Sequence, residues 1–70
     1  MTAPIWSGTV TEWDDPKGFG TITADDGRRY FVHCTALADG TRTTTVGAAV
    51  RFAVVAGHLG RYEAASVQVV

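Results

Sequence analysis

The sequence predicts an all-β domain in which five short strands form a sandwich or a closed barrel. Three observations lead to this prediction. Apolar and polar residues alternate with a period of two through several segments, which is typical of strands with one buried face. Clusters of glycine, proline and aspartate separate these segments, and no segment has three turns of helical periodicity. Closure is favoured because it removes the exposed sheet edges that a chain of 70 residues cannot otherwise cover.

The first two expected strands cover residues 6–13 and 18–24. Threonine and valine, which favour extended backbone, are enriched in the first of them. Pro16 fixes its own backbone φ and disfavours helical backbone at Asp15. Residues 14–17 are therefore expected to form the turn between the two strands.

The third expected strand covers residues 29–34 and follows the second across a tight turn. The dipeptide Asp26-Gly27 in that turn is a strong hairpin signal. Residues 35–45 lack strand periodicity, so they are expected to form a loop that a helical turn near residues 35–37 opens.

The fourth and fifth expected strands cover residues 48–56 and 61–69, with a turn at residues 57–60. Trp6 is expected to pack at the end of the barrel and Tyr62 to lie on its outside. The apolar side chains expected to point inward are Val10, Ile22, Val32, Val50, Phe52, Val54 and Val67.

Aromatic residues are predicted to gather on one face of the second and third strands. Residues two apart point to the same side of a strand, so Phe19 shares a face with Thr21, and Phe31 shares one with His33. Pairing across the hairpin brings two phenyl rings and an imidazole together on a surface that water reaches. Soluble monomers rarely expose such clusters, and stacking of nucleic-acid bases would account for this one. The alternative is that Phe19 and Phe31 belong to the core of a sheet covered on both faces.

Composition limits the possible functions. Six Lys and Arg against seven Asp and Glu give a net charge of −1, which argues against an indiscriminate polyanion binder but not against a binder that relies on stacking. Cys34 is the only cysteine, so an internal disulfide and a cysteine-rich zinc site are excluded. A chain of 70 residues is expected to form a single domain, over residues 1–70. Because neither a signal peptide nor an apolar run of membrane-spanning length is found, we expect it in the cytoplasm.

Three short motifs give a more specific indication. The sequence GTV at residues 8–10, KGFG at residues 17–20 and FVH at residues 31–33 resemble the cold-shock domain family in order and spacing. The resemblance covers about residues 8–67, which is nearly the whole chain. It implies a five-stranded antiparallel barrel of the OB type that binds single-stranded RNA or DNA.

The resemblance also implies which residues bind. Residues 17–22 correspond to the first RNA-binding motif of the family and residues 30–34 to the second. The positions that contact nucleic acid in the family match Lys17, Phe19, Phe31 and His33.

Several positions depart from the family pattern. Glu12 occupies the place of the leading tryptophan in the first strand, and Trp13 stands one place later. Thr21 and Cys34 replace aromatic residues, and the long loop is one residue shorter, with Arg42 near its tip and no ring. Because each stacked base contributes on the order of 1–3 kcal/mol, the loss of stacking surfaces predicts roughly micromolar affinity or weaker.

The expected site combines stacking side chains with cations that follow the nucleic-acid backbone. Its residues are Trp13, Lys17, Phe19, Phe31, His33, Arg29, Arg42 and Arg61. The predicted function is non-enzymatic binding of single strands with low sequence specificity, of the RNA-chaperone or gene-expression-regulator type. The alternative is an OB barrel that contacts other proteins through a weakened nucleic-acid face, because Glu12 and Thr21 stand where aromatic residues are usual.

Catalysis is not expected. The two histidines lie far apart, and no nucleophile–base pair or metal-ligand spacing is found. His33 and Cys34 are neighbours in an expected strand, so they should face opposite sides and should not share a metal or a proton. We therefore expect no metal, cofactor or small-molecule substrate. We also expect a monomer without a membrane partner.

Overall fold

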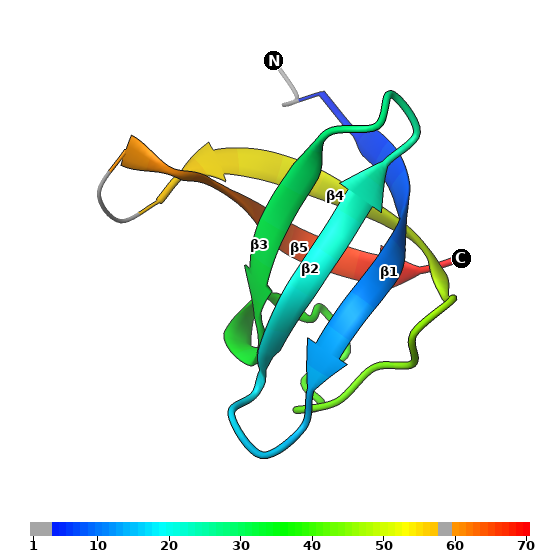
Figure 1. Cartoon of the computed structure of the whole chain (residues 1–70), viewed down its shortest axis with the longest axis vertical. Helices are drawn as coiled ribbons and strands as arrows, with labels where there is room; N and C mark the ends of the chain where they lie inside the picture. Colours follow the sequence, from blue (N-terminus) through cyan, green and yellow to red (C-terminus); the bar gives the residue numbers. More distant parts are fainter. Residues whose placement is uncertain (1–3, 58–59) are drawn as a thin grey trace.

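A computed structural model describes residues 4–57 and 60–70, and in these residues five strands close into a barrel (Figure 1). The strands are β1 (Trp6–Asp14), β2 (Phe19–Ala24), β3 (Arg29–His33), β4 (Ala49–Ala56) and β5 (Tyr62–Val69). Their order around the barrel is β1-β2-β3-β5-β4. The prediction of a closed five-stranded barrel is thus confirmed. All neighbours pair antiparallel except β3 and β5, which pair in parallel at Phe31 and Glu63.

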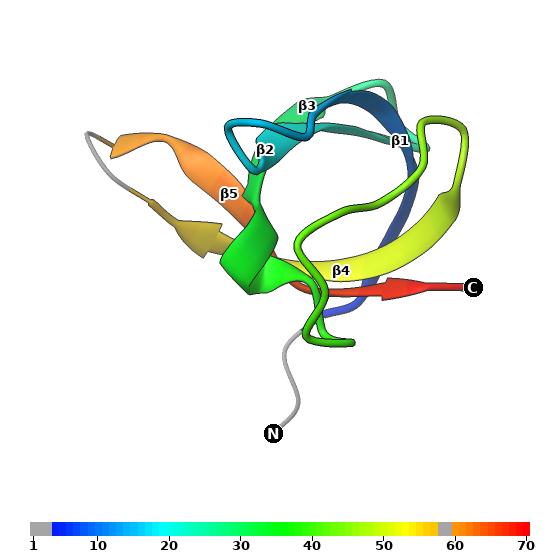
Figure 2. The same ribbon diagram turned by 90° about the horizontal axis from the view of Figure 1, so that it is seen from below.

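Each strand begins and ends within one residue of its expected range. The third strand is shorter than expected because Cys34 already belongs to a turn of 3-10 helix, η1 (Cys34–Ala36). His33 caps this turn, since its imidazole accepts a hydrogen bond from the backbone N–H of Thr35. The view in Figure 2 looks along the barrel and shows η1 and the following loop at the near end.

Strands β1 and β2 approach each other closely at Gly20. A Cβ atom at this position would overlap the backbone carbonyl of Glu12, so only glycine allows the observed pairing. The turn before β2 is closed by a hydrogen bond of 2.8 Å from the Gly18 N–H to the Asp14 carbonyl, with Gly18 at a φ of 71°. These two glycines hold the β1–β2 hairpin in a shape that brings β1 against the KGFG motif.

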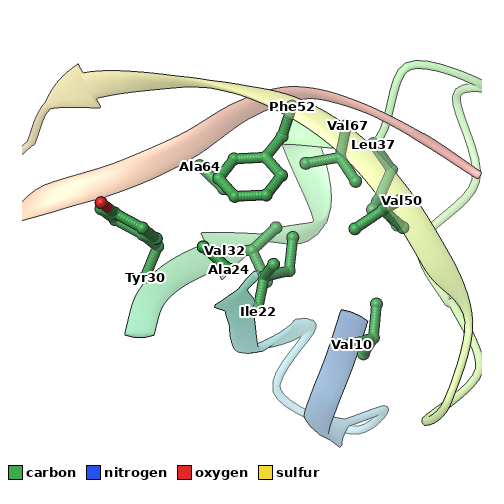
Figure 3. Packing of buried hydrophobic residues seen from close by; sticks show 10 residues of the cluster. All are labelled: Val10, Ile22, Ala24, Tyr30, Val32, Leu37, Val50, Phe52, Ala64 and Val67. Carbon is green, nitrogen blue, oxygen red and sulfur yellow. The ribbon is translucent and has the colours of Figure 1, made fainter. Parts of the chain in front are cut away.

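The core lies inside the barrel and contains apolar residues from all five strands and from the loop after η1 (Figure 3). Its buried members are Val10, Ile22, Ala24, Tyr30, Val32, Leu37, Val50, Phe52, Ala64 and Val67. The predicted inward residues are buried except Val54, which is half-buried and packs against the cluster. The prediction was wrong there because the pairing of β1 with β4 begins at Trp6 and Phe52, so Val54 lies beyond the end of β1.

Trp6 closes this end of the core, as expected. Its ring centroid lies 6.3 Å from that of Tyr30, which in turn lies 5.8 Å from that of Phe52. Tyr62 is 64% exposed and lies on the outside of the barrel. Beyond Trp6, β4 and β5 continue as a two-stranded ribbon that projects from the barrel (Figure 1).

Candidate nucleic-acid interface

The β2–β3 hairpin brings the predicted aromatic cluster together on the outer face of the barrel. Phe19 pairs with His33, and Thr21 pairs with Phe31, so all four side chains share a face. The ring centroids of Phe19 and Phe31 lie 5.4 Å apart with an interplanar angle of 36°. Both rings are half-buried and His33 is exposed, whereas the alternating residues Ile22 and Val32 are buried. The alternative assignment of the two Phe residues to the core is therefore wrong.

His33 is held in a defined orientation by the turn that follows it. Its Nδ1 accepts a hydrogen bond of 3.3 Å from the Thr35 N–H and lies 2.9 Å from the Thr35 hydroxyl oxygen. A neutral imidazole that accepts at Nδ1 carries its proton on Nε2. The Sγ of Cys34 lies 3.9 Å from the same Nδ1. The expectation that His33 and Cys34 face opposite sides is thus wrong, because β3 ends at His33 and the chain turns into η1.

Trp13 is placed differently from the two Phe residues. A β-bulge between Val10 and Glu12 shifts the register, so that Glu12 pairs with Thr21 and Trp13 pairs with Gly20. Gly20 faces the barrel interior, and Trp13 accordingly packs against the core. Glu12 therefore shares the outer face with the aromatic cluster, whereas Trp13 is half-buried at its border, packed against the core.

The indole of Trp13 also connects two loops. Its Nε1 donates a hydrogen bond of 2.7 Å to the Oδ1 of Asp15, which accepts a second one from the hydroxyl of Thr43 in the long loop. Trp13 lines a hollow of about 370 Å³ on the outer surface. We call it the Trp13 hollow, and its lining residues are Glu12, Trp13, Asp14, Phe19, Gly20, Thr21 and Phe31.

Two of the expected cations lie at the end of the cluster near Phe19. Lys17 is exposed in the turn that precedes β2. The long loop folds back so that a guanidinium nitrogen of Arg42 would lie 3.2 Å from a Cβ added at Gly18. Arg42 and Lys17 thus flank the same glycine, although they are far apart in the sequence.

The other two expected cations lie beyond Phe31. Arg29 and Arg61 line a second hollow, of about 560 Å³, on the side of β3 that faces β5. We call it the arginine hollow, and its lining residues are Arg28, Arg29, Tyr30, Phe31, Gly60, Arg61 and Tyr62. Sequence reasoning missed Arg28 and Tyr62 as members of this surface. Only the parallel pairing of β3 with β5 brings them together, and an alternation pattern does not reveal which strands are neighbours.

Other chemistry finds little support in the described part of the chain. Among residues 4–57 and 60–70, no group of three His, Cys, Asp or Glu side chains is placed to hold a metal ion. The same residues contain no helix of the length and hydropathy needed to cross a membrane. In the long loop, hydrogen bonds from the side chain and then the backbone of Thr41 lower the pKa of Asp39.

Comparisons with known proteins agree with this geometry. The family model described as the "cold-shock" DNA-binding domain matches residues 6–70. The major cold shock protein CspA of Pseudomonas aeruginosa is 42% identical over 65 residues, which cover 91% of this chain and 93% of that protein. Cold shock protein 1 of Arabidopsis thaliana is 41% identical over 87% of this chain, and glycine-rich protein 2 of Nicotiana sylvestris is 44% identical over 86%.

The chain spans only part of some relatives. It matches 21% of the length of the Arabidopsis protein and 29% of the length of the Nicotiana protein. The solved structure of drosophila Unr CSD456 superposes with a TM-score of 0.80 over 97% of this chain and 27% of that one, at 23% identity, which supports the fold. With the family model and the Pseudomonas relative both spanning nearly its whole length, the chain belongs to the cold-shock DNA-binding domain family.

Proposed function

We propose that the chain binds single-stranded RNA or DNA by stacking unpaired bases on the outer face of β2 and β3. The observation that carries the proposal is the pair of half-buried rings of Phe19 and Phe31, with centroids 5.4 Å apart, beside an exposed His33. Every base has a flat π-face, so stacking binds single strands without strong sequence preference. A base stacked in this way is held apart from a pairing partner, which is the action of an RNA chaperone.

Each predicted residue has a role in this proposal. Phe19 and Phe31 are the main stacking platforms, and His33 is a third one, oriented by Thr35. Trp13 forms the wall of the hollow beside them. The cations that contact the sugar–phosphate backbone are Lys17 and Arg42 at one end of the cluster and Arg29 and Arg61 at the other.

The strength of binding follows from the number of platforms. Two or three bases stacked at about 1–3 kcal/mol each, less the cost of ordering the strand, correspond to a dissociation constant that is roughly micromolar or weaker. Glu12 and Asp14 line the Trp13 hollow and repel phosphate there. For a single strand, the slope of log K against log salt concentration is about −0.7 for each phosphate contact. A few contacts therefore predict a shallow salt dependence.

Binding does not require a second copy or a chemical step in this proposal. The aromatic cluster lies within one barrel, on two adjacent strands, so a monomer presents the whole surface. The side chains of the cluster supply stacking surfaces, and only the imidazole of His33 can also form hydrogen bonds. The proposed activity is therefore binding without catalysis.

The test is a titration of a short oligopyrimidine, followed by tryptophan fluorescence and by a labelled oligonucleotide. Wild-type protein should bind saturably at low salt, and Phe31→Ala should weaken binding at least about fivefold, as expected for one lost stacked base. Val55→Ala is the matched control, since Val55 is an exposed apolar residue of β4 outside the cluster. Absence of saturable binding up to high micromolar protein would refute the proposal.

A second candidate function is protein binding through the same face. It is favoured by the position of Glu12, which is exposed on the outer face beside Thr21. A co-precipitation with and without nuclease separates the two candidates, because a protein partner is retained after the nucleic acid has been digested.

A further inference from the structure

The two hollows on the outer surface differ sharply in charge. β3 lies between β2 and β5, so the Trp13 hollow and the arginine hollow lie on opposite sides of Phe31, which lines both. Two carboxylates, of Glu12 and Asp14, line the Trp13 hollow. Among the residues that the structure describes, three guanidinium groups and no carboxylate line the arginine hollow. In a chain with a net charge of −1, half of the six basic residues therefore surround one depression.

We propose that the arginine hollow is a separate nucleotide site, which binds one further unit of the single strand that crosses Phe31. Its base stacks on the ring of Tyr62, and its phosphodiester lies against the guanidinium groups of Arg28, Arg29 and Arg61. This inference rests on the proposed function and extends it to residues outside the two motifs of the hairpin. The strand then runs from Phe19 across Phe31 to Tyr62.

The guanidinium groups are available for a phosphate. Arg28 lies 3.7 Å from a carboxylate oxygen of Asp26, and Arg29 lies 3.7 Å from one of Glu12. Three of the four side chains are 64–73% exposed and that of Asp26 is 44% exposed, and exposed pairs at such distances contribute little free energy. A phosphate offers stronger, bidentate hydrogen bonds to arginine, so it displaces these contacts readily.

Tyr62 supplies the flat surface that the nucleotide needs. It is the first residue of β5 and is 64% exposed. The next residue, Glu63, pairs with Phe31, so the parallel pairing sets Tyr62 beside the strand that carries Phe31. The exposed ring of Tyr62, next to that of Phe31, suits the base of one nucleotide. The three guanidinium groups of the hollow suit its phosphate. This continuity with the aromatic cluster favours a nucleotide over an acidic peptide.

The experiment measures binding of an oligothymidylate of about six nucleotides at several salt concentrations. Arg61→Gln should weaken binding several-fold. It should also make the slope of log K against log salt concentration shallower by about 0.7, the change expected for one lost phosphate contact. Tyr62→Ala should weaken binding at least about fivefold, and Tyr62→Phe should bind like wild type. Arg51→Gln is the matched control, because Arg51 is an exposed arginine of β4 that pairs with Ser7 and Gln68, away from the hollow.

The outcomes separate this inference from the proposed function. Equal effects of Arg61→Gln and Arg51→Gln, or wild-type binding by a folded Tyr62→Ala variant, would overturn the arginine hollow while Phe31→Ala still weakens binding. Competition by thymidine monophosphate would identify a site for free nucleotides, and Arg61-dependent binding of polyglutamate would identify an acidic protein partner. Either of these results would also overturn the assignment. If wild-type protein fails to bind the oligonucleotide at all, the proposed function itself fails.

Discussion

Replacing Thr21 by phenylalanine should add a stacking platform to the centre of the aromatic face. Thr21 follows Phe19 on the same face of β2, and it pairs with Glu12 on one side and Phe31 on the other. It is half-buried and lines the Trp13 hollow of about 370 Å³, so a larger side chain has room on the outer surface. The new ring would lie beside the rings of Phe19 and Phe31 on the outer face, without entering the core.

The size of the effect follows from the energy of one stacked base. A further base stacked at about 1–3 kcal/mol tightens binding by about 5- to 150-fold. The fold should gain slightly, since an aromatic cross-strand pair contributes roughly 0.2–1 kcal/mol relative to alanine. Glu12 remains beside the new ring, so the lower half of the range is expected at low salt, where its repulsion of phosphate is least screened.

The assay is the dissociation constant of a labelled oligopyrimidine, measured for wild type, Thr21→Phe and Thr23→Phe. Thr23 is the matched control because it lies on the same face of β2, two residues further, where it contacts Thr11 and pairs with Arg29 outside the Trp13 hollow. Tighter binding by Thr21→Phe alone is expected. If both variants fold and bind like wild type, bases do not stack on this face and the reasoning is refuted.

Four further outcomes follow from the structure. Glu12→Gln should tighten oligonucleotide binding at low salt, with a gain that disappears at high salt; a gain independent of salt in the same titration would contradict an electrostatic cause. Phe52→Ala should cost about 3–5 kcal/mol in the free energy of unfolding measured with denaturant, because Phe52 is 1% exposed in the core; a cost below about 1 kcal/mol would contradict this packing. Gly20→Ala should cost about 1–3 kcal/mol in the same measurement, since its Cβ overlaps the Glu12 carbonyl, and an unchanged midpoint would argue against the β1–β2 register. The lowered pKa of Asp39 stabilises the long loop above the ordinary carboxyl pKa, and this stabilisation is lost as the pH falls below about 4; the amide chemical shift of Thr41 should follow that titration in wild type but not in Asp39→Asn.

Much of the architecture could be predicted because it depends on local patterns. Alternation and turn residues place all five strands to within one residue, and they assign Phe19 and Phe31 to the face opposite Ile22 and Val32. Face assignment within a hairpin needs only the period of two and the position of the turn. The aromatic cluster was therefore predictable before any contact was known.

The position of Trp13 was not predictable in the same way. A strict alternation from Val10, which is buried, places Glu12 inward and Trp13 outward. The bulge between Val10 and Glu12 moves Glu12 to the outer face and leaves Trp13 half-buried at the border of the core. A bulge is a property of the pairing between two strands, and the sequence of one strand does not encode it. The parallel neighbours β3 and β5 escaped prediction for a similar reason, because pairing between distant strands leaves no local pattern.

The distribution of charge explains how a chain with a net charge of −1 can bind a polyanion. The Debye length at physiological ionic strength is about 8 Å, so a phosphate responds mainly to the charges immediately around it. Three guanidinium groups line the arginine hollow, where Arg28 and Arg29 each have one carboxylate at 3.7 Å, whereas two carboxylates line the Trp13 hollow. Stacking on Phe19 and Phe31 does not depend on charge, so it does not determine towards which hollow the bound strand continues. The bulge that places Glu12 on the outer face therefore helps to set the path of the strand, and the parallel pair of β3 and β5 supplies the cations that receive it.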